Sequence, residues 1–314
     1  MRYFVAGGAG FIGSETCHRL ARNPDNHIVV YDNLSSGRYD LIKDLESNLN
    51  FIFVRGDIKD LKKLTEAMRY SDVVYHFASN ADIAKAMADP TIDFYEGTLL
   101  TQNILEAMRI NGVKKIIYAS GSGVYGDHKD IWMNEDISPM IPVSPYGASK
   151  MAGEALISAY CHMFDMTGFV FRFANVIGKN STHGAILDFI NKLKNNPNDL
   201  EILGNGEQSK SYVYVSDIID GILKVIQWEE SKYNYYNVAT LDYITVKQIA
   251  DIVCEEMGLT NVKYTFTSSE NKGWKGDIGT CRLDSTKLRN LGWVNRYTTK
   301  EAVKKSIREM LGKE

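Results

Sequence analysis

The stretch VAGGAGFIG at residues 5–13 decides the fold that the sequence predicts. It follows a short apolar run and opens a segment with helical spacing. Gly7 permits a tight turn, Gly10 lets backbone amides approach a pyrophosphate, and Gly13 lets the helix pack closely. The helix N-terminus then offers unpaired N–H groups and partial positive charge to a phosphate. Glycine spacing alone also fits an ordinary strand-turn-helix, so the surrounding sequence must decide.

Short apolar strands alternate with helical segments downstream of this turn. The expected strands are 3–6, 27–31, 51–55, 73–77, 115–119 and 169–173, and the expected helices between them are 11–21, 61–68, 95–109 and 145–164. This alternation predicts a parallel sheet with right-handed crossovers. Because the strands are almost entirely apolar, helices should cover both faces. We therefore predict an α/β fold with a Rossmann-type parallel sheet.

Acidic residues after the second and third strands favour a dinucleotide. Asp32 ends the second strand, where its carboxylate can accept both ribose hydroxyls of the adenosine and would repel a 2′-phosphate. This favours NAD over NADP as the cofactor. Asp57 follows the third strand and suits the adenine edge, although it could instead cap the helix that begins near Leu61.

The pattern changes after residue 175. Helical segments at 186–194, 217–227, 245–257 and 299–311 are separated by polar loops. We predict a NAD-binding Rossmann domain over residues 1–174 and a smaller C-terminal α/β substrate-binding region over residues 175–314. Because no Ser/Gly linker separates the two, we expect them to be interlaced.

The composition excludes several classes of function. The 314 residues include 44% hydrophobic and 24% charged residues, with a net charge of −3 and no basic stripe, so nucleic-acid binding is not expected. No run of about 18 apolar residues predicts a membrane span. The apolar run at the N-terminus is also too short for a signal peptide.

The cysteines and histidines indicate a reducing compartment and no metal site. The four cysteines, at 17, 161, 254 and 281, are far apart in the sequence and include no C-x-x-C. Buried free thiols are therefore favoured over disulfides. The six histidines show no spacing typical of metal ligands. We expect a cytoplasmic protein without a metal.

A tyrosine–lysine pair is the candidate catalytic centre. Tyr-x-x-x-Lys occurs four times, but only Tyr146 and Lys150 lie just inside a helix that follows the fifth strand. Ser144 suits the N-cap and Pro145 the first helical position. Four-residue spacing puts phenol and ammonium on one face, so we expect the pKa of Tyr146 to lie below about 10. The phenolate could then take a proton from a hydroxyl while nicotinamide accepts the hydride. The alternative is an incidental surface pair.

A series of short motifs runs over nearly the whole chain. They are GGAGFIG (7–13), YDNLSSG (31–37), GDI (56–58), HFAS (76–79), VYG (124–126), SPYGASK (144–150), RFANVIG (172–178), NGEQSKSYVYVSD (205–217), GWKGD (273–277) and LGW (291–293). With these motifs the sequence resembles the extended short-chain dehydrogenase/reductases, in particular the nucleotide-sugar epimerases and dehydratases. The archaeal-type UDP-glucose 4-epimerases are the most similar group.

The resemblance implies tightly held NAD, transient oxidation at sugar C4 and a homodimer or higher homo-oligomer joined through the helices near 95–109 and 145–163. The cofactor-binding residues that it implies are Gly7, Gly10, Phe11, Ile12, Gly13, Asp32, Asn33, Asp57, Ile58, Phe77, Ala78, Ser79, Tyr146, Lys150 and Phe173. It places Asn175 on the substrate diphosphate and the segment 205–217, with Lys210 and Tyr212, beside the nucleotide. Lys210 and Lys275 could contact phosphate or be solvated, and Trp274 could stack on the base or belong to the core.

Two departures from the family pattern concern chemistry. The family carries Ser or Thr where this chain has Gly121, so Ser120, Ser122 or a water has to supply the missing hydroxyl. Losing one hydrogen bond to a developing charge can cost roughly 10²–10³ in rate. Gly97 replaces an asparagine that is common near the cofactor phosphates.

Several functions remain open at this point. A 4-epimerase of a UDP-sugar is favoured, and the alternative is a net 4-dehydrogenase of a GDP- or UDP-linked hexose or heptose. A 4,6-dehydratase ranks lower because Ser122-Gly123 stands where those enzymes carry Asp-Glu. The retention of Tyr146 and Lys150 argues against an inactive NAD-binding protein.

Overall fold

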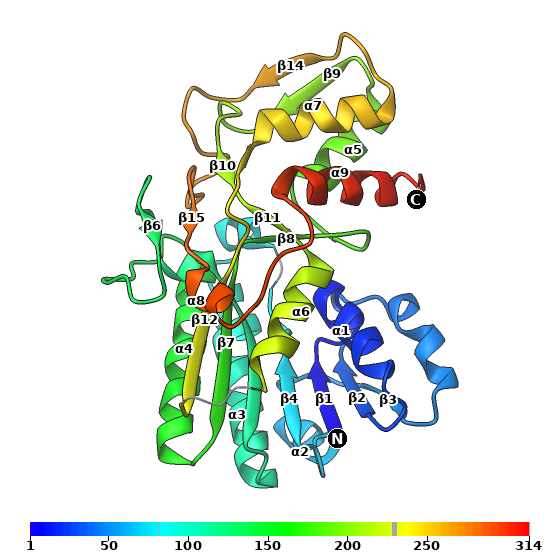
Figure 1. Cartoon of the computed structure of the whole chain (residues 1–314), viewed down its shortest axis with the longest axis vertical. Helices are drawn as coiled ribbons and strands as arrows, with labels where there is room; N and C mark the ends of the chain where they lie inside the picture. Colours follow the sequence, from blue (N-terminus) through cyan, green and yellow to red (C-terminus); the bar gives the residue numbers. More distant parts are fainter. Residues whose placement is uncertain (81, 228–230, 314) are drawn as a thin grey trace. The chain divides into compact units, whose positions relative to one another are not determined.

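Seven strands form the central sheet of the computed structural model, which describes residues 1–80, 82–227 and 231–313 (Figure 1). The strand order is β12-β7-β5-β4-β1-β2-β3, and the pairings among β1 to β5 are parallel. The strands are β1 (Arg2–Ala6), β2 (His27–Asp32), β3 (Phe51–Arg55), β4 (Val73–His76), β5 (Lys115–Gly121), β7 (Thr167–Phe173) and β12 (Tyr233–Val238). The reversal of strand order at β1 is typical of dinucleotide-binding sheets. The predicted Rossmann-type fold is confirmed.

Six of these strands are predicted by the sequence, and β12 is missed. Its sequence, YNYYNV, mixes tyrosine with asparagine, a residue depleted in strands and common in turns. In the structure the asparagine side chains find partners outside the strand. For example, the buried Asn237 side chain donates to the backbone oxygens of Met133 and Asp284, at 2.8 and 2.9 Å. Tertiary contacts therefore override the local preference.

Helices pack against this sheet and against one another. They are α1 (Phe11–Ala21), α2 (Leu61–Ala67), α3 (Leu99–Asn111) and α4 (Pro145–Met163), with a π-helical turn, η4 (Phe94–Thr98), leading into α3. α1 contacts β1 and β2, α3 contacts β4, and α4 contacts β5. Buried aliphatic and aromatic side chains of these elements form one core.

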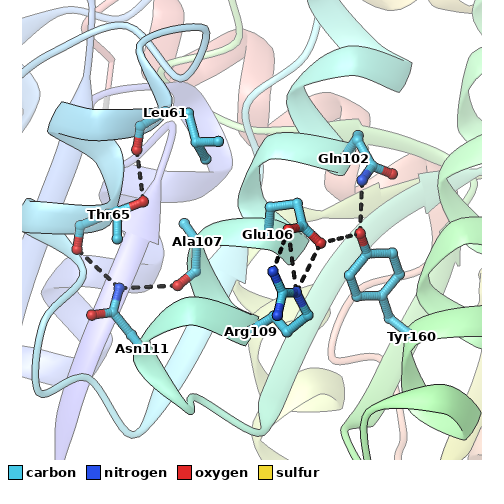
Figure 2. Close-up of polar contacts among 8 residues, drawn as sticks. All are labelled: Leu61, Thr65, Gln102, Glu106, Ala107, Arg109, Asn111 and Tyr160. Carbon is cyan, nitrogen blue, oxygen red and sulfur yellow. Dashed lines mark hydrogen bonds and ion pairs between the residues drawn. The ribbon is translucent and has the colours of Figure 1, made fainter.

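Polar contacts tie α2, α3 and α4 together at the surface (Figure 2). The Asn111 side-chain amide donates to the backbone oxygens of Thr65 and Ala107, both at 2.9 Å. The Tyr160 hydroxyl accepts from Gln102 at 2.7 Å and also bonds Glu106. These bonds fix α4, which carries the candidate catalytic pair, against its neighbour α3.

Two compact units are present, and each is built from several stretches of chain. Unit 1 comprises Met1–Val124, Pro145–Arg172 and Ile222–Tyr236, and unit 2 comprises Tyr125–Ser144, Phe173–Gly221 and Asn237–Glu314. The break after Arg172 lies close to the expected division after residue 174. Two segments depart from that division. Residues 125–144 belong to unit 2, because their strand β6 pairs with β15 there. Residues 222–236 belong to unit 1, because β12 is part of the central sheet.

Unit 2 consists of small sheets and helices. Its paired strands are β8 (Asn175–Ile177) with β11 (Tyr212–Tyr214), β9 (Asp199–Ile202) with β14 (Lys263–Phe266), β10 (Ser209–Lys210) with β13 (Ile244–Thr245), and β6 (Trp132–Met133) with β15 (Arg282–Leu283). The helices after residue 175 are α5 (Ala185–Asn195), α6 (Val215–Val225), α7 (Val246–Met257), α8 (Thr286–Asn290) and α9 (Thr299–Met310). Capping boxes define the starts of α7 and α9. α5, α7 and α9 share the second core.

The four cysteines are free and buried, as the sequence predicts. Across the part of the chain that the structure describes, no helix has the length and apolar character needed to cross a membrane. Within the same residues, no group of three or more His, Cys, Asp or Glu side chains could hold a metal ion.

Candidate active site

The turn after β1 contains two positions, 7 and 13, that only glycine can occupy. Gly7 has φ +78°, and a Cβ there would lie 2.6 Å from the backbone nitrogen of Ala78. A Cβ on Gly13 would lie 2.1 Å from the carbonyl oxygen of Gly7. Both distances are far below van der Waals contact, so the turn depends on these two residues.

The N-terminus of α1 faces this turn without a side-chain cap. Gly10 is the N-cap and makes no side-chain capping bond, while Phe11 and Ile12 open the helix. The first amides of a helix have no intrahelical partner, and they suit a pyrophosphate. The uncapped helix end and the glycines required beside it fit NAD.

Asp32 ends β2 and is buried beside the turn. Its Oδ2 accepts from the Ala9 backbone nitrogen at 3.0 Å, and its Oδ1 accepts from the Leu34 nitrogen at 2.8 Å. Burial raises the pKa of the Asp32 carboxyl, while these two backbone bonds lower it. Each carboxylate oxygen keeps a further acceptor site, which suits the two ribose hydroxyls of NAD.

Asn33 and Asp57 lie together after β2 and β3. The Asn33 side chain donates to Asp57 Oδ2 at 3.3 Å, and Asp57 Oδ1 accepts from the Lys59 backbone nitrogen at 2.9 Å. The N-cap of α2 is Asp60, which accepts from the Lys63 nitrogen at 3.0 Å. The alternative in which Asp57 caps this helix is therefore wrong.

The remaining cofactor candidates follow the carboxyl ends of strands. Phe77, Ala78 and Ser79 follow β4, and the backbone nitrogens of Phe77 and Ala78 bond the Ala6 carbonyl. Ile58 is buried after β3, and Phe173 is the buried last residue of β7. Ligands in α/β sheets bind at such strand ends.

Tyr146 and Lys150 lie on one face of α4, which begins at Pro145 as predicted. The Lys150 Nζ lies 5.6 Å from the centre of the Tyr146 ring and 5.1 Å from that of Tyr118. It donates to the Ala119 carbonyl at 2.8 Å. Lys150 is buried and Tyr146 is partly buried beside the end of β5, so the two do not form an incidental surface pair.

The expectation of a depressed tyrosine pKa is wrong for the free protein. Burial, together with the smaller effect of the Asp93 charge, raises the pKa of Tyr146 to about 12. Burial lowers the pKa of Lys150 to about 8, opposed by the charges of Asp93 and Glu154. Desolvation of both groups therefore outweighs their mutual stabilisation before any ligand binds.

The two candidate hydroxyls near Gly121 have different surroundings. Ser120 is buried, and its hydroxyl donates to Glu154 Oε1 at 2.5 Å. Glu154 also forms a buried ion pair with Arg172 at 2.7 Å. Ser122, in the 3₁₀ turn η5 (Ser122–Val124), is partly exposed. Among the described residues it has no side-chain hydrogen-bond partner, so it is the hydroxyl that is free to bond a substrate.

The substrate candidates of unit 2 form two groups. Asn175 and Tyr212 are directly paired residues of β8 and β11. Lys210 Nζ lies 2.7 Å from Asp277 Oδ1 and 5.8 Å from the centre of the Trp274 ring. The Trp274 Nε1 is buried and has no hydrogen-bond partner in the described chain.

Lys275 lies apart from these contacts because its side chain is exposed. Asp277 is buried and also accepts from the Gly273 backbone nitrogen at 2.9 Å, so it orders the loop that carries Trp274. Lys210 is partly buried and is paired with Asp277.

Sequence reasoning misses Asp93, Glu154 and Asp277. Glu154 was within reach of the sequence, since it lies four residues after Lys150 on the same helix face. Asp277 ends the GWKGD motif. No local signal marks Asp93, because its importance comes from burial and from neighbours that are distant in sequence.

Known proteins are similar to this chain over its whole length. Residues 3–239 match the model of the “NAD dependent epimerase/dehydratase family”. The chain is 32% identical over 313 residues to the “Putative UDP-glucose 4-epimerase” of Methanocaldococcus jannaschii, with 98% of this chain and 97% of that protein covered. A crystal structure of a UDP-galactose 4-epimerase matches with 37% identity and a TM-score of 0.88, over 100% and 99% of the two chains. The UDP-glucose 4-epimerase of Thermotoga maritima with UDP-glucose matches with 28% identity and a TM-score of 0.87, over 99% of each chain.

Proposed function

The chain belongs to the NAD-dependent epimerase/dehydratase family, and we propose that it is a UDP-sugar 4-epimerase. The pair of Tyr146 and Lys150 on α4 carries this proposal, since it lies in the same unit as a glycine turn that fits NAD. UDP as the nucleotide is supported by the similar proteins named for UDP-glucose and UDP-galactose.

The chemistry follows from the groups on α4. When bound, NAD supplies a hydride acceptor for the carbon that is oxidised. Tyr146 takes the proton from the C4 hydroxyl, and Lys150 stabilises the resulting phenolate. The keto-sugar then rotates in the site so that its other face is presented. The same phenol returns its proton to O4. The cofactor is regenerated in each cycle, so the reaction needs no external oxidant.

Residues of unit 2 are proposed to hold the nucleotide. Asn175 and Lys210 would bond the diphosphate, with Lys275 adding charge from the exposed loop, and Tyr212 and Trp274 would border the nucleotide. The Lys210–Asp277 ion pair supports this assignment because it keeps the ammonium ordered. A bidentate arginine is not needed for a phosphate contact, since lysine binds phosphate as a point charge.

Product analysis tests the proposed function. The purified protein is incubated with UDP-glucose or UDP-galactose, followed by NMR of the sugar and absorbance of NADH at about 340 nm. Interconversion of the two sugars without net NADH supports the epimerase. Absence of any epimer, with saturating NAD present and NAD binding verified, contradicts it.

A net 4-dehydrogenase is the second candidate, and Gly121 is the observation that favours it. Without a hydroxyl at this position, and with Ser120 engaged by Glu154, the keto-sugar could be held less firmly and released. Release would leave one NADH per keto-sugar, and an outside oxidant would have to recycle it. Stoichiometric NADH without an epimer in the same assay would establish this alternative.

Replacing Ser122 should affect catalysis, whereas replacing Ser120 should affect stability. Ser122→Ala is expected to lower kcat by roughly 10²-fold, because it removes the hydroxyl proposed to bond the reacting oxygen. Ser120→Ala leaves one acceptor of the buried Glu154–Arg172 pair unmet and should lower Tm instead. Steady-state kinetics and thermal unfolding separate the two. Equal kinetic effects in both variants would contradict the assignment.

A homodimer through α3 and α4 is proposed as the assembly. Small side chains, Ala155 and Ala159, are exposed one turn apart on α4, and Met163 is 73% exposed at its end. Small exposed residues on a helix permit close approach of a second helix pair. Sedimentation equilibrium should give twice the chain mass, and Ala155→Arg should yield the monomer. A wild-type monomer at micromolar concentration would contradict the proposal.

The cytoplasm is proposed as the location. The four buried thiols remain free, which fits a reducing compartment.

A further inference from the structure

We propose that Asp93 is a positioning residue of the active site, whose buried carboxylate balances the charge of the Lys150 ammonium beside Tyr146. The inference rests on the proposed function for its catalytic meaning. The effect of Asp93 on the Lys150 pKa involves unit 1 alone and can be measured without turnover.

The Asp93 carboxylate is buried and only half satisfied. The residue is 1% exposed, and its Oδ1 accepts from the Asn80 side-chain amide at 3.0 Å. Its Oδ2 is also buried and has no hydrogen-bond partner in the part of the chain that the structure describes. A buried charge without partners is costly, so this oxygen calls for a compensating positive group.

The backbone brings Asp93 to α4. Asp93 is the residue before the π-helical turn η4, which packs against α4. The contact is close at Gly97, where a Cβ would lie 2.5 Å from the Ser149 hydroxyl. Ser149 is the neighbour of Lys150 in the helix. A glycine at 97 thus lets η4 approach the residues that carry the catalytic pair, and π turns of this kind are frequent at functional sites.

Lys150 needs such a partner. The residue is 3% exposed, and among the described residues its ammonium donates one hydrogen bond, to the Ala119 carbonyl. Two carboxylates act on its charge, Asp93 first and Glu154 second. Glu154 is already neutralised by Arg172, with which it forms a buried ion pair at 2.7 Å. Asp93, unlike Glu154, is not paired with an arginine, so its charge can balance that of Lys150.

The remaining buried ionisable groups beside the pair, Tyr118 and His76, are uncharged near neutral pH. Burial raises the pKa of Tyr118, in β5, far above neutrality. Burial, together with the smaller effect of the Lys150 charge, lowers the pKa of His76, in β4, to about 3. Asp89 also acts on Asp93, but its side chain is exposed. The positive charge of buried Lys150 is thus balanced mainly by the negative charge of buried Asp93.

Removing the Asp93 charge should shift the pKa values of both Lys150 and Tyr146 in one direction. A nearby anion raises the pKa of any group, because it favours the protonated form of both an ammonium and a phenol. Asp93 raises the pKa of Lys150 and that of Tyr146. Without it, both pKa values should fall together. A residue that only supports the packing would lower the rate without moving either pKa.

Asp93→Asn is the direct test, because asparagine keeps the shape and can still accept from Asn80. In NAD-loaded protein, both limbs of the pH profile of kcat should move to lower pH, by about one unit. In protein labelled at lysine Cε, the NMR signal that disappears in Lys150→Arg should titrate near pH 8 in the wild type and lower in Asp93→Asn. Asp89→Asn, which removes an exposed charge from the same segment, should leave both readouts unchanged.

A second variant guards against loss of folding. Asn80→Ala removes the hydrogen bond to Asp93 Oδ1 but keeps the carboxylate, so it should move the Lys150 titration less than Asp93→Asn does. An unmoved Lys150 titration in folded Asp93→Asn overturns the inference, whatever the activity. A shifted titration in a protein that converts no nucleotide sugar supports the role of Asp93 and refutes the proposed function alone.

Discussion

Tyr146→Phe is expected to abolish turnover, by at least about 10³-fold, while NAD remains bound. The variant removes one oxygen, and with it the group proposed to move the C4 proton; acid–base catalysis of this kind contributes about 10²–10⁴-fold. The ring stays in place over the Lys150 ammonium, so packing should be preserved. Product NMR measures the turnover, and absorbance of the nucleotide released on denaturation measures the bound NAD.

The matched control is Tyr39→Phe. Tyr39 belongs to another Tyr-x-x-x-Lys pattern, and its exposed hydroxyl bonds Glu46 at the surface. The same loss of an oxygen there should leave turnover within about twofold of the wild type, as surface substitutions have small effects. Near-normal activity of Tyr146→Phe would show that another group moves the proton.

Gly13→Ala should weaken NAD binding. The added Cβ would meet the Gly7 carbonyl oxygen at 2.1 Å, and the α carbon of Gly8 at 2.8 Å. Because both obstacles are backbone, the turn itself has to move, at a cost of about 1–3 kcal/mol. That energy corresponds to a loss of roughly 10–100-fold in NAD affinity. Titration calorimetry with NAD measures it on protein stripped of nucleotide.

Gly112→Ala is the control for this variant. Gly112 ends α3 with φ +70°, but a Cβ there meets nothing within 4 Å. The change should lower the free energy of unfolding by about 1–2 kcal/mol through backbone strain and leave NAD affinity unchanged. If Gly13→Ala bound NAD as the wild type does, the turn would not be the pyrophosphate site.

The parallel sheet and its glycine turn could be predicted because their signals are local. The apolar strands and the sequence at 5–13 each specify their own conformation, and α1 matches the expected range of 11–21. β12 could not be predicted in this way, since its Asn237 is satisfied only by contacts with distant segments. The helical pattern at 95–109 likewise does not distinguish the π turn η4 from the α-helix that follows it.

The candidate site shows the same division. Helical spacing places Tyr146 and Lys150 on one face, which the structure confirms. Spacing says nothing of burial, so the rise in the Tyr146 pKa and the part of Asp93 in it stay hidden. Nor does spacing distinguish Ser120 from Ser122, because the partner of Ser120 is Glu154 on another element. Desolvation and charge balance become visible only when the chain is folded.

The fate of the hydrogen on C4 shows whether the sugar is oxidised and reduced by NAD at that carbon. UDP-galactose carrying deuterium at C4 is incubated with the protein, and the recovered UDP-glucose is analysed by NMR and mass spectrometry. The inverted C4 should keep its deuterium, because the hydrogen leaves and returns as hydride without exchanging with solvent. Replacement of the label by solvent hydrogen, or inversion with no transient NADH in the bound protein, would contradict this mechanism.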